Sequence, residues 1–345
     1  MDERDRRLLD ALQAEFPLTP LPFRALGEIV GLSEAKTLAR VEALQEARLI
    51  RQIGAIFDSH SLGYTSSLVA MRVEPAALDA AAAVVSAHPG VSHNYQRDHA
   101  FNLWFTVAVP PGGDLAWTVE YLHRRAHAQA TRLLPTLKLF KVGVRLDMGG
   151  AGASAGGGYR ESDRPAMGRA GLAPLDIQVI RELQEPTPLV PAPYRPMAER
   201  IGVSEARFLE AALSLRGRGY LRRMAAVLRH REAGFLANAM GVWIVPPERI
   251  EAVGSIMGSA AEVSHCYLRP TYPDWPYNLY TMVHGRQTAD CRRIVEALSA
   301  AAGIREVALL YSLKEYKKVR LKYFTPELDD WQRRAAAAPE RQHEQ

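Results

Sequence analysis

Cysteine is scarce in this chain. Only Cys266 and Cys291 occur among its 345 residues, which is too few for a disulfide framework and fits a reducing compartment. The sequence therefore predicts a cytoplasmic protein whose stability comes from packed cores rather than from cross-links.

Long apolar runs are absent as well. No segment approaches the roughly 20 consecutive apolar residues that cross a bilayer. The first ten residues, MDERDRRLLD, are mostly charged and lack the apolar centre of a secretory signal. We therefore expect neither a membrane partner nor a signal peptide.

The chain does carry enough apolar residues to bury real cores. They make up 48% of the sequence and charged residues 23%, which is ordinary for a globular protein. The length suits two or three domains. A formal net charge of +5 favours an anionic partner. DNA would satisfy this charge, and so would a small molecule with many carboxylates, so charge alone does not choose between them.

The sequence repeats itself at a nearly constant offset. Matched segments keep register along both halves: Asp5 with Asp176, residues 31–35 with 202–206, Arg51 with Arg222, and, one residue later in register, Ser92-His93 with Ser264-His265. Chance does not hold register over such a length, so the chain is two copies of one module.

Each copy begins with the pattern of a winged helix-turn-helix. The pattern predicts three helices, and a Gly-containing turn joins the second to the third. Ser33 suits the N-cap of the third helix because its hydroxyl can accept a hydrogen bond from a helical N–H. A β-branched stretch at 50–57 predicts the wing strand. The remaining pattern is a strand (68–73), a helix (75–87), two strands around Asp98, a helix (115–130) and a last strand (137–146), which is the order of a ferredoxin-like unit.

The predicted fold class is therefore α+β, a tandem repeat of a winged helix-turn-helix and a ferredoxin-like β-α-β-β-α-β domain. The predicted boundaries are 1–58 and 62–148 for the first copy, 149–171 for a flexible Gly-rich linker, 172–230 and 234–324 for the second copy, and 325–345 for a charged tail. This combination resembles the Lrp/AsnC family of transcription regulators over nearly all of each half. A shared fold does not decide the function.

A row of polar side chains recurs in the two ferredoxin-like units. His93, Tyr95 and Arg97 alternate along one predicted strand, as His265, Tyr267 and Arg269 do along its counterpart, so each trio shares one face. The other sheet face is covered by helices, and a polar row on a buried face is costly unless it is satisfied. We expect a polar ligand between the two sheets to satisfy it. Cys266 alternates away from the row and is expected to pack.

The segments around these rows are more specific than the fold. The strings VSHNYQRDHAFNLWFTV and VSHCYLRPTYPDWPYNLYTMVHG resemble the signature hairpins of the two siroheme decarboxylase subunits, in the order of the fused form found in heme d1 pathways. The resemblance implies an enzyme that converts siroheme to 12,18-didecarboxysiroheme by removing carbon dioxide from the C12 and C18 acetate groups.

The residue types suit that chemistry. Loss of carbon dioxide leaves a carbanion-like methylene that needs an electron sink and then a proton, and a histidine can supply the proton. We hypothesise that His93 and His265 are acid or iron-facing residues, with Tyr95 and Tyr267 as orienting groups. Arg97 and Arg269 would anchor carboxylates. His99 and His284 are further candidates for substrate binding.

The macrocycle itself can accept the electrons, so no cofactor is expected and the iron enters as part of the substrate. No separate metal site is expected. His123 and His127 have the i, i+4 spacing of metal ligands on a predicted helix, but no carboxylate ligand is near, so a solvated face is favoured. Trp104 and Tyr280 occupy matched positions, where they either stack on a macrocycle or fill the sheet interface.

Two other functions stay open. The helix-turn-helix units carry basic residues on their second helices, namely Lys36, Arg40, Arg48, Arg207, Arg216 and Arg218. They are interrupted by glutamates that phosphates would repel, so we expect a retained structural module and no DNA partner. The alternatives are an Lrp/AsnC-type DNA-binding regulator that senses a small molecule, and a tetrapyrrole carrier without activity. The two halves are expected to form an internal pseudo-dimer, and a further homodimer is left open.

Overall fold

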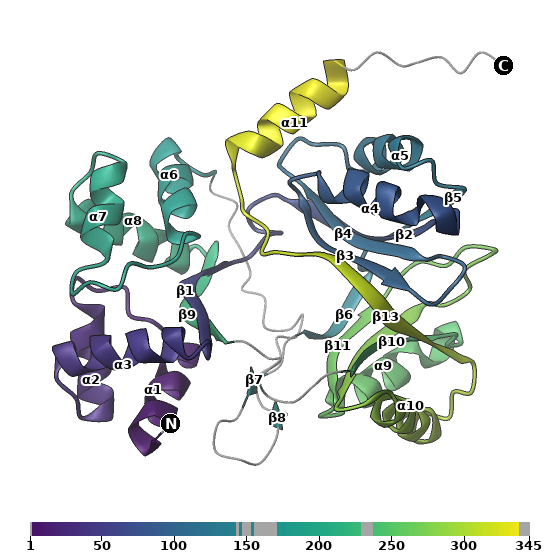
Figure 1. The fold of residues 1–345 in the computed structure, drawn as a ribbon, viewed down its shortest axis with the longest axis horizontal. Coiled ribbons are helices and arrows are strands. Elements are labelled where there is room, and N and C mark those ends of the chain that lie inside the picture. The colour runs from purple at the N-terminus through teal and green to yellow at the C-terminus, as the bar shows by residue number, and fades with distance from the viewer. Residues whose placement is uncertain (1, 143–144, 147–152, 155–170, 229–236, 338–345) are drawn as a thin grey trace.

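The computed structural model describes residues 2–142, 145–146, 153–154, 171–228 and 237–337. Within these ranges the two helical units lie together at one side, and the strand-rich parts of both halves lie together at the other (Figure 1). None of the described helices combines the length and the apolar character that spanning a bilayer requires.

The helical units have the predicted pattern twice. They consist of α1 (Glu3–Ala14), α2 (Pro22–Val30), α3 (Glu34–Glu46) and β1 (Ile50–Phe57), and of α6 (Pro174–Leu183), α7 (Tyr194–Arg200), α8 (Glu205–Gly217) and β9 (Leu221–Leu228). The hydroxyl of Ser33 accepts a bond from the Lys36 N–H at 3.4 Å, and its repeat Ser204 does so from the Arg207 N–H at 3.2 Å. The predicted N-cap is confirmed and recurs in the second copy.

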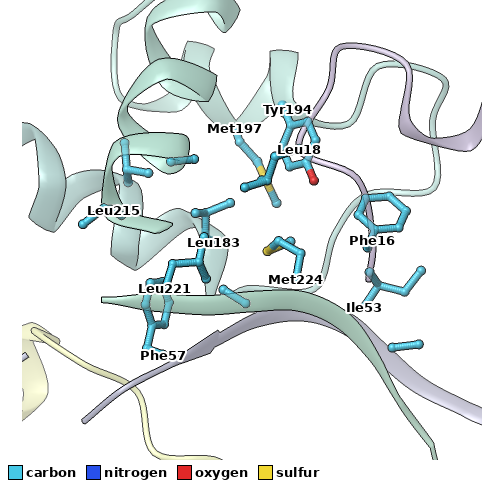
Figure 2. Packing of buried hydrophobic residues seen from close by; sticks show 14 of the residues in the cluster. Phe16, Leu18, Ile53, Phe57, Leu183, Tyr194, Met197, Leu215, Leu221 and Met224 are labelled. Atoms are coloured by element: carbon cyan, nitrogen blue, oxygen red, sulfur yellow. The ribbon is translucent and has the colours of Figure 1, made fainter. Parts of the chain in front are cut away.

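The two wing strands pair with each other. β1 and β9 form an antiparallel two-stranded sheet in which Ala55 lies opposite Met224. Side chains of both copies, including Phe16 and Ile53 from the first and Leu183 and Met224 from the second, meet in one apolar core against this sheet (Figure 2). The two winged units therefore form a single packed body rather than two independent modules.

The ferredoxin-like units supply the larger sheet. The first contains β2 (Thr65–Arg72), α4 (Leu78–Ser86), β3 (Val91–Arg97), β4 (Leu103–Val109), α5 (Leu115–Arg125), β5 (Ala130–Leu134) and β6 (Lys138–Val142). The second contains β10 (Ala237–Trp243), α9 (Ile250–Ser259), β11 (Val263–Leu268), β12 (Leu279–Gly285), α10 (Thr288–Ala302) and β13 (Val307–Lys318). One-turn 3₁₀ helices, Pro75–Ala77 and Pro247–Arg249, precede α4 and α9.

The last strand of each unit crosses to the other half, which corrects the prediction that a strand at 137–146 completes the first unit. β5 is the strand that pairs with β2 of its own half, and β6 pairs with β11 of the other. β13 pairs with a strand of each half: Val307–Tyr311 pair with β10 of its own half, and the following residues to Lys318 pair with β3 of the other. All nine strands thus join in the order β5-β2-β4-β3-β13-β10-β12-β11-β6.

The helix predicted at 115–130 ends earlier than expected. α5 stops at Arg125, and His127 has a left-handed backbone with φ of 49°, which a continuing helix does not allow. His123 and His127 therefore do not share a helix face, and His123 instead shares a hydrogen bond with Thr131 Oγ1 at 2.9 Å.

The C-terminal helix is docked on the sheet-bearing part. α11 (Pro326–Ala337) places Trp331 with its ring centroid 4.0 Å from that of His88 and against Tyr121. Residues 338–345 of the predicted tail lie outside the described residues, as does most of the predicted linker at 149–171. Within that linker, the described strand β8 (Ala153–Ser154) pairs with β7 (Arg145–Leu146).

Candidate active site

The predicted polar rows exist as rows. The His93 and Tyr95 rings stack at 6.2 Å between centroids, and the Arg97 guanidinium lies 5.8 Å from the Tyr95 ring. The second row has the same order, with 5.9 Å between the rings of His265 and Tyr267 and 4.8 Å from Arg269 to the Tyr267 ring. Strand alternation therefore puts each trio on one face, as predicted.

The residues between the row members face the helices. The Asn94 amide donates a hydrogen bond to the Ala82 carbonyl of α4 at 3.1 Å. The Cys266 thiol is fully buried and donates to the Gly254 carbonyl of α9 at 3.9 Å. Burial raises the pKa of Cys266 to about 12, so its thiol is inert and the predicted packing role is confirmed.

The arginine ends of the rows are buried against the opposite half. Arg97 Nη1 donates to the Leu310 carbonyl of β13 at 2.9 Å, and Arg269 Nη1 donates to the Leu134 carbonyl of β5. The expected ligand between the sheets is therefore not what satisfies this end of the rows, because backbone carbonyls of the opposite half, on β13 and β5, supply the acceptors. The role of the two arginines as carboxylate anchors stays a prediction.

These guanidinium groups are only partly satisfied. Among the described residues the Nε atoms of Arg97 and Arg269 are buried without a hydrogen-bond partner. Burial lowers the pKa of Arg97 to about 10 and lowers the pKa of Arg269 as well. Even so, both guanidinium groups stay charged near neutral pH, and each places a positive charge beside the ring of Tyr95 or Tyr267.

Aromatic side chains fill an apolar cluster to which both halves contribute. Trp104 and Tyr280 are about 1–2% exposed and lie in one cluster with Trp275. The Trp104 indole N–H donates to the Phe101 carbonyl at 2.6 Å, and the Trp275 indole N–H donates to the Tyr280 hydroxyl. Of the two alternatives left open by the sequence, the structure favours interface packing over stacking on a macrocycle.

The histidine ends of the rows are only half-buried, and each imidazole is held by the serine before it. Ser92 Oγ lies 3.0 Å from His93 Nδ1, and Ser264 Oγ lies 2.8 Å from His265 Nδ1. With Nδ1 engaged, Nε2 is the ring nitrogen available to a ligand. No role was expected for Ser92 and Ser264, although each precedes its histidine in both copies of the repeat.

Of the two additional histidines, only His284 lies beside a row. Ser264 Oγ is 2.6 Å from His284 Nε2, so one hydroxyl links His284 to His265. His99 lies past the arginine end of β3, where it contacts Trp275 with 5.1 Å between ring centroids and its Nδ1 accepts from the Phe101 N–H. The structure therefore does not bring His99 to His93.

Positive charge surrounds both histidines. Burial lowers the pKa of His93, and the nearby cations of Lys318 and Arg51 lower it further, against the opposing effect of Glu315. Arg51 belongs to wing strand β1, so the helix-turn-helix body contributes charge here.

The two rows also influence each other. Burial lowers the pKa of His265 to about 4, and the charges of His284, His93, Arg269 and Lys141 act in the same direction. Because His93 acts on His265, the two half-buried histidines belong to one electropositive region rather than to two remote sites. No group of three or more metal-ligating side chains occurs among the described residues.

This fold and these rows define a tandem Lrp/AsnC-like protein with a histidine-bearing row in each half. The model of an AsnC-like ligand binding domain matches residues 61–141 and 232–317, and that of a siroheme decarboxylase NirDL-like HTH domain matches 5–51 and 176–222. The duplicated matches agree with the repeat found in the sequence.

Individual proteins agree with the family models. Siroheme decarboxylase of Hydrogenobacter thermophilus is 40% identical over 327 residues, which cover 94% of this chain and 96% of that protein. The crystal structure of the siroheme decarboxylase NirDL in complex with an iron-uroporphyrin III analogue has a TM-score of 0.80 at 34% identity and covers 97% of this chain and 99% of its own. A siroheme decarboxylase beta subunit of Methanosarcina barkeri is 44% identical over 143 residues, 41% of this chain and 94% of that subunit. The chain belongs to the siroheme decarboxylase family.

Proposed function

We propose that this protein is a carboxy-lyase that removes carbon dioxide from the C12 and C18 acetate groups of siroheme, giving 12,18-didecarboxysiroheme for heme d1 biosynthesis. The observation that carries the proposal is the pair of serine-held histidines, one from each half, in a single electropositive region. The full-length relative named siroheme decarboxylase and the related structure with an iron-uroporphyrin III analogue support the choice of substrate.

Charge explains why a polycarboxylate would bind here. The buried cations of Arg97 and Arg269 and the cations near the histidines, Lys318 and Arg51, favour carboxylates over neutral ligands. Because backbone carbonyls engage Arg97 and Arg269, we propose that they supply positive charge and position Tyr95 and Tyr267, in addition to their predicted role as carboxylate anchors.

The histidines would act as proton donors to the methylene left by each departing carboxylate. Their lowered pKa values keep them neutral in the empty protein at pH 7. Carboxylates of a bound substrate add negative charge beside the imidazoles, which raises those pKa values and loads the proton that is later delivered. Siroheme iron enters as part of the substrate, and we propose no further cofactor.

Mass spectrometry of the tetrapyrrole after anaerobic incubation with the purified protein tests this function. Loss of two molecules of carbon dioxide per siroheme is expected. An unchanged mass together with a shifted absorption spectrum would instead indicate a carrier that binds siroheme without turnover.

A further inference from the structure

A chain of hydrogen bonds extends from His265 toward solvent. His265 Nδ1 is 2.8 Å from Ser264 Oγ, Ser264 Oγ is 2.6 Å from His284 Nε2, and His284 Nδ1 is 2.6 Å from Asn238 Oδ1. Ser264 is 1% exposed, whereas Asn238 at the far end is exposed. These hydrogen bonds therefore connect the half-buried His265 imidazole, through the buried Ser264 hydroxyl and the His284 ring, to a polar group at the surface.

The donors and acceptors in this chain have one consistent arrangement. Asn238 Oδ1 can only accept, so His284 Nδ1 carries hydrogen and its Nε2 accepts from the Ser264 hydroxyl. The Met282 carbonyl is the competing acceptor for that hydroxyl, but at 3.4 Å it is much farther than the 2.6 Å to His284. The Ser264 oxygen is then left to accept from His265 Nδ1–H, which leaves His265 Nε2 as the basic nitrogen.

The first half lacks this arrangement. In the strand ladders, Asn238 of β10 lies opposite His284 of β12, and the corresponding pair of β2 and β4 is Ser66 and Ala108. The correspondence is fixed by the adjacent ladders, because Tyr95 pairs with Trp104 where Tyr267 pairs with Tyr280, four residues before Ala108 and His284. Among the described residues, His93 thus has its serine, but no histidine shares a hydrogen bond with that serine.

We propose that His284 and Asn238 are positioning residues that hold His265, through Ser264, in the Nδ1–H tautomer with Nε2 directed to the substrate, and that this makes the two halves unequal in the reaction. The proposal rests on the proposed function and deepens it. In the step assigned to His265, the bond between the acetate methylene and its carboxylate breaks and carbon dioxide leaves. The electron pair stays on the methylene, conjugated with the macrocycle, and the proton on Nε2 of the His265 imidazolium forms the new C–H bond. The neutral Nδ1–H tautomer that remains is the one that the hydrogen bonds from Ser264 to His284 and Asn238 stabilise.

Steady-state kinetics with siroheme test the positioning role. His284→Ala should lower kcat about 10- to 100-fold, the loss that follows removal of a group orienting a metal-bound histidine, with KM unchanged. His284→Gln offers an amide oxygen to Ser264 and should restore most of kcat, and Ser264→Ala combined with His284→Ala should lose no more than either alone. His60→Ala, at an exposed histidine in a turn after β1, is the matched control and should behave as the parent chain does.

Nitrogen NMR of the ¹⁵N-histidine-labelled full chain without substrate reads the tautomer directly. The His265 Nδ1 resonance should have the protonated shift in the parent chain and in His284→Gln, and an averaged shift in His284→Ala. An unchanged kcat in His284→Ala, or the same tautomer in His284→Ala as in the parent, would overturn the proposal. If the parent chain leaves siroheme unaltered, the proposed function fails, while the tautomer comparison still decides whether His284 positions His265.

Discussion

His93 and His265 share a sequence context but have different surroundings. Each is preceded by a serine that engages Nδ1 and followed by a tyrosine that stacks on its ring. Within the part of the chain that the structure describes, only the serine beside His265 shares a hydrogen bond with a second histidine. Two residues with the same local motif can thus divide a reaction that removes two carboxylates.

Replacement of either row histidine by alanine should strongly reduce turnover of siroheme. His93→Ala and His265→Ala each remove a proton donor, a contribution of about 100-fold or more in rate, while both sites are half-buried and tolerate a smaller side chain. Product analysis at early times should show singly decarboxylated siroheme where one half is impaired. Full activity in both variants, with an unchanged thermal unfolding midpoint, would remove the histidines from the mechanism.

His88 makes stability depend on pH in a predictable direction. It is fully buried, and burial lowers its pKa to about 3, whereas an unfolded histidine titrates near 6.5. Between these values the unfolded state binds more protons, so the free energy of unfolding decreases as the pH falls below about 6.5. His93 and His265 act with the same sign.

Urea unfolding of His88→Asn isolates this contribution. The asparagine oxygen can replace His88 Nδ1 as acceptor of the Gly90 N–H but does not titrate. Between pH 6 and 4.5 the variant should lose stability less steeply than the parent chain, by up to about 1.4 kcal/mol per pH unit. Parallel slopes for the two proteins would show that His88 is not the titrating group.

At the scale of elements, the wing strands are used for internal pairing. In winged helix-turn-helix proteins a wing and a recognition helix contact DNA, but here β1 and β9 pair with each other. Basic residues of the second helices are also engaged by carboxylates: Arg40 by Asp2 and Asp5, Arg207 by Glu210, Arg216 by Glu15, and Arg218 by Asp176. Both observations support the prediction of a structural module.

Fluorescence anisotropy with duplex DNA checks this conclusion. At physiological salt we expect no binding tighter than the nonspecific range of about 10⁻⁴ to 10⁻⁶ M, because four of the six basic residues of these helices already pair with carboxylates. Tight binding to a particular sequence, with a steep dependence on salt, would favour a regulator.

The elements themselves were largely predictable, but their partners were not. The alternation in residues 91–97 correctly gave the shared face of His93, Tyr95 and Arg97, because side-chain direction in a strand is local. The pairing partner of β6 depends on which strand edge is open in the assembled sheet. The residues from Lys138 to Val142 do not specify that edge. The contact of His284 with Ser264 was missed for the same reason, since it joins two strands.

At the scale of the whole molecule, the exchanged strands make each half incomplete alone. β6 of the first half pairs with β11, and β13 of the second half pairs with β3. Separation of the halves would leave open strand edges at β3 and β11, which favour aggregation.

Expression of residues 1–148 and 172–345 as two chains tests this interdependence. Together they should elute as one heterodimer in size-exclusion chromatography and decarboxylate siroheme, because the strand pairs that join the halves, β6 with β11 and β13 with β3, lie within the two segments. Each segment produced alone should aggregate or form oligomers. Two stable monomers with native-like helix and strand content would contradict the exchange.

The pairing of β3 with β13 also affects how the protein is made. Arg97 lies opposite Ser312, and His93 lies opposite Lys318, so a ribosome completes the neighbour of β3 only after about 200 further residues have been added. At roughly 5–20 residues per second, the nascent first half waits for many seconds with an unpaired edge. Contacts of such long sequence separation also slow folding. We therefore expect production in a host to depend on chaperones that shield this edge during translation.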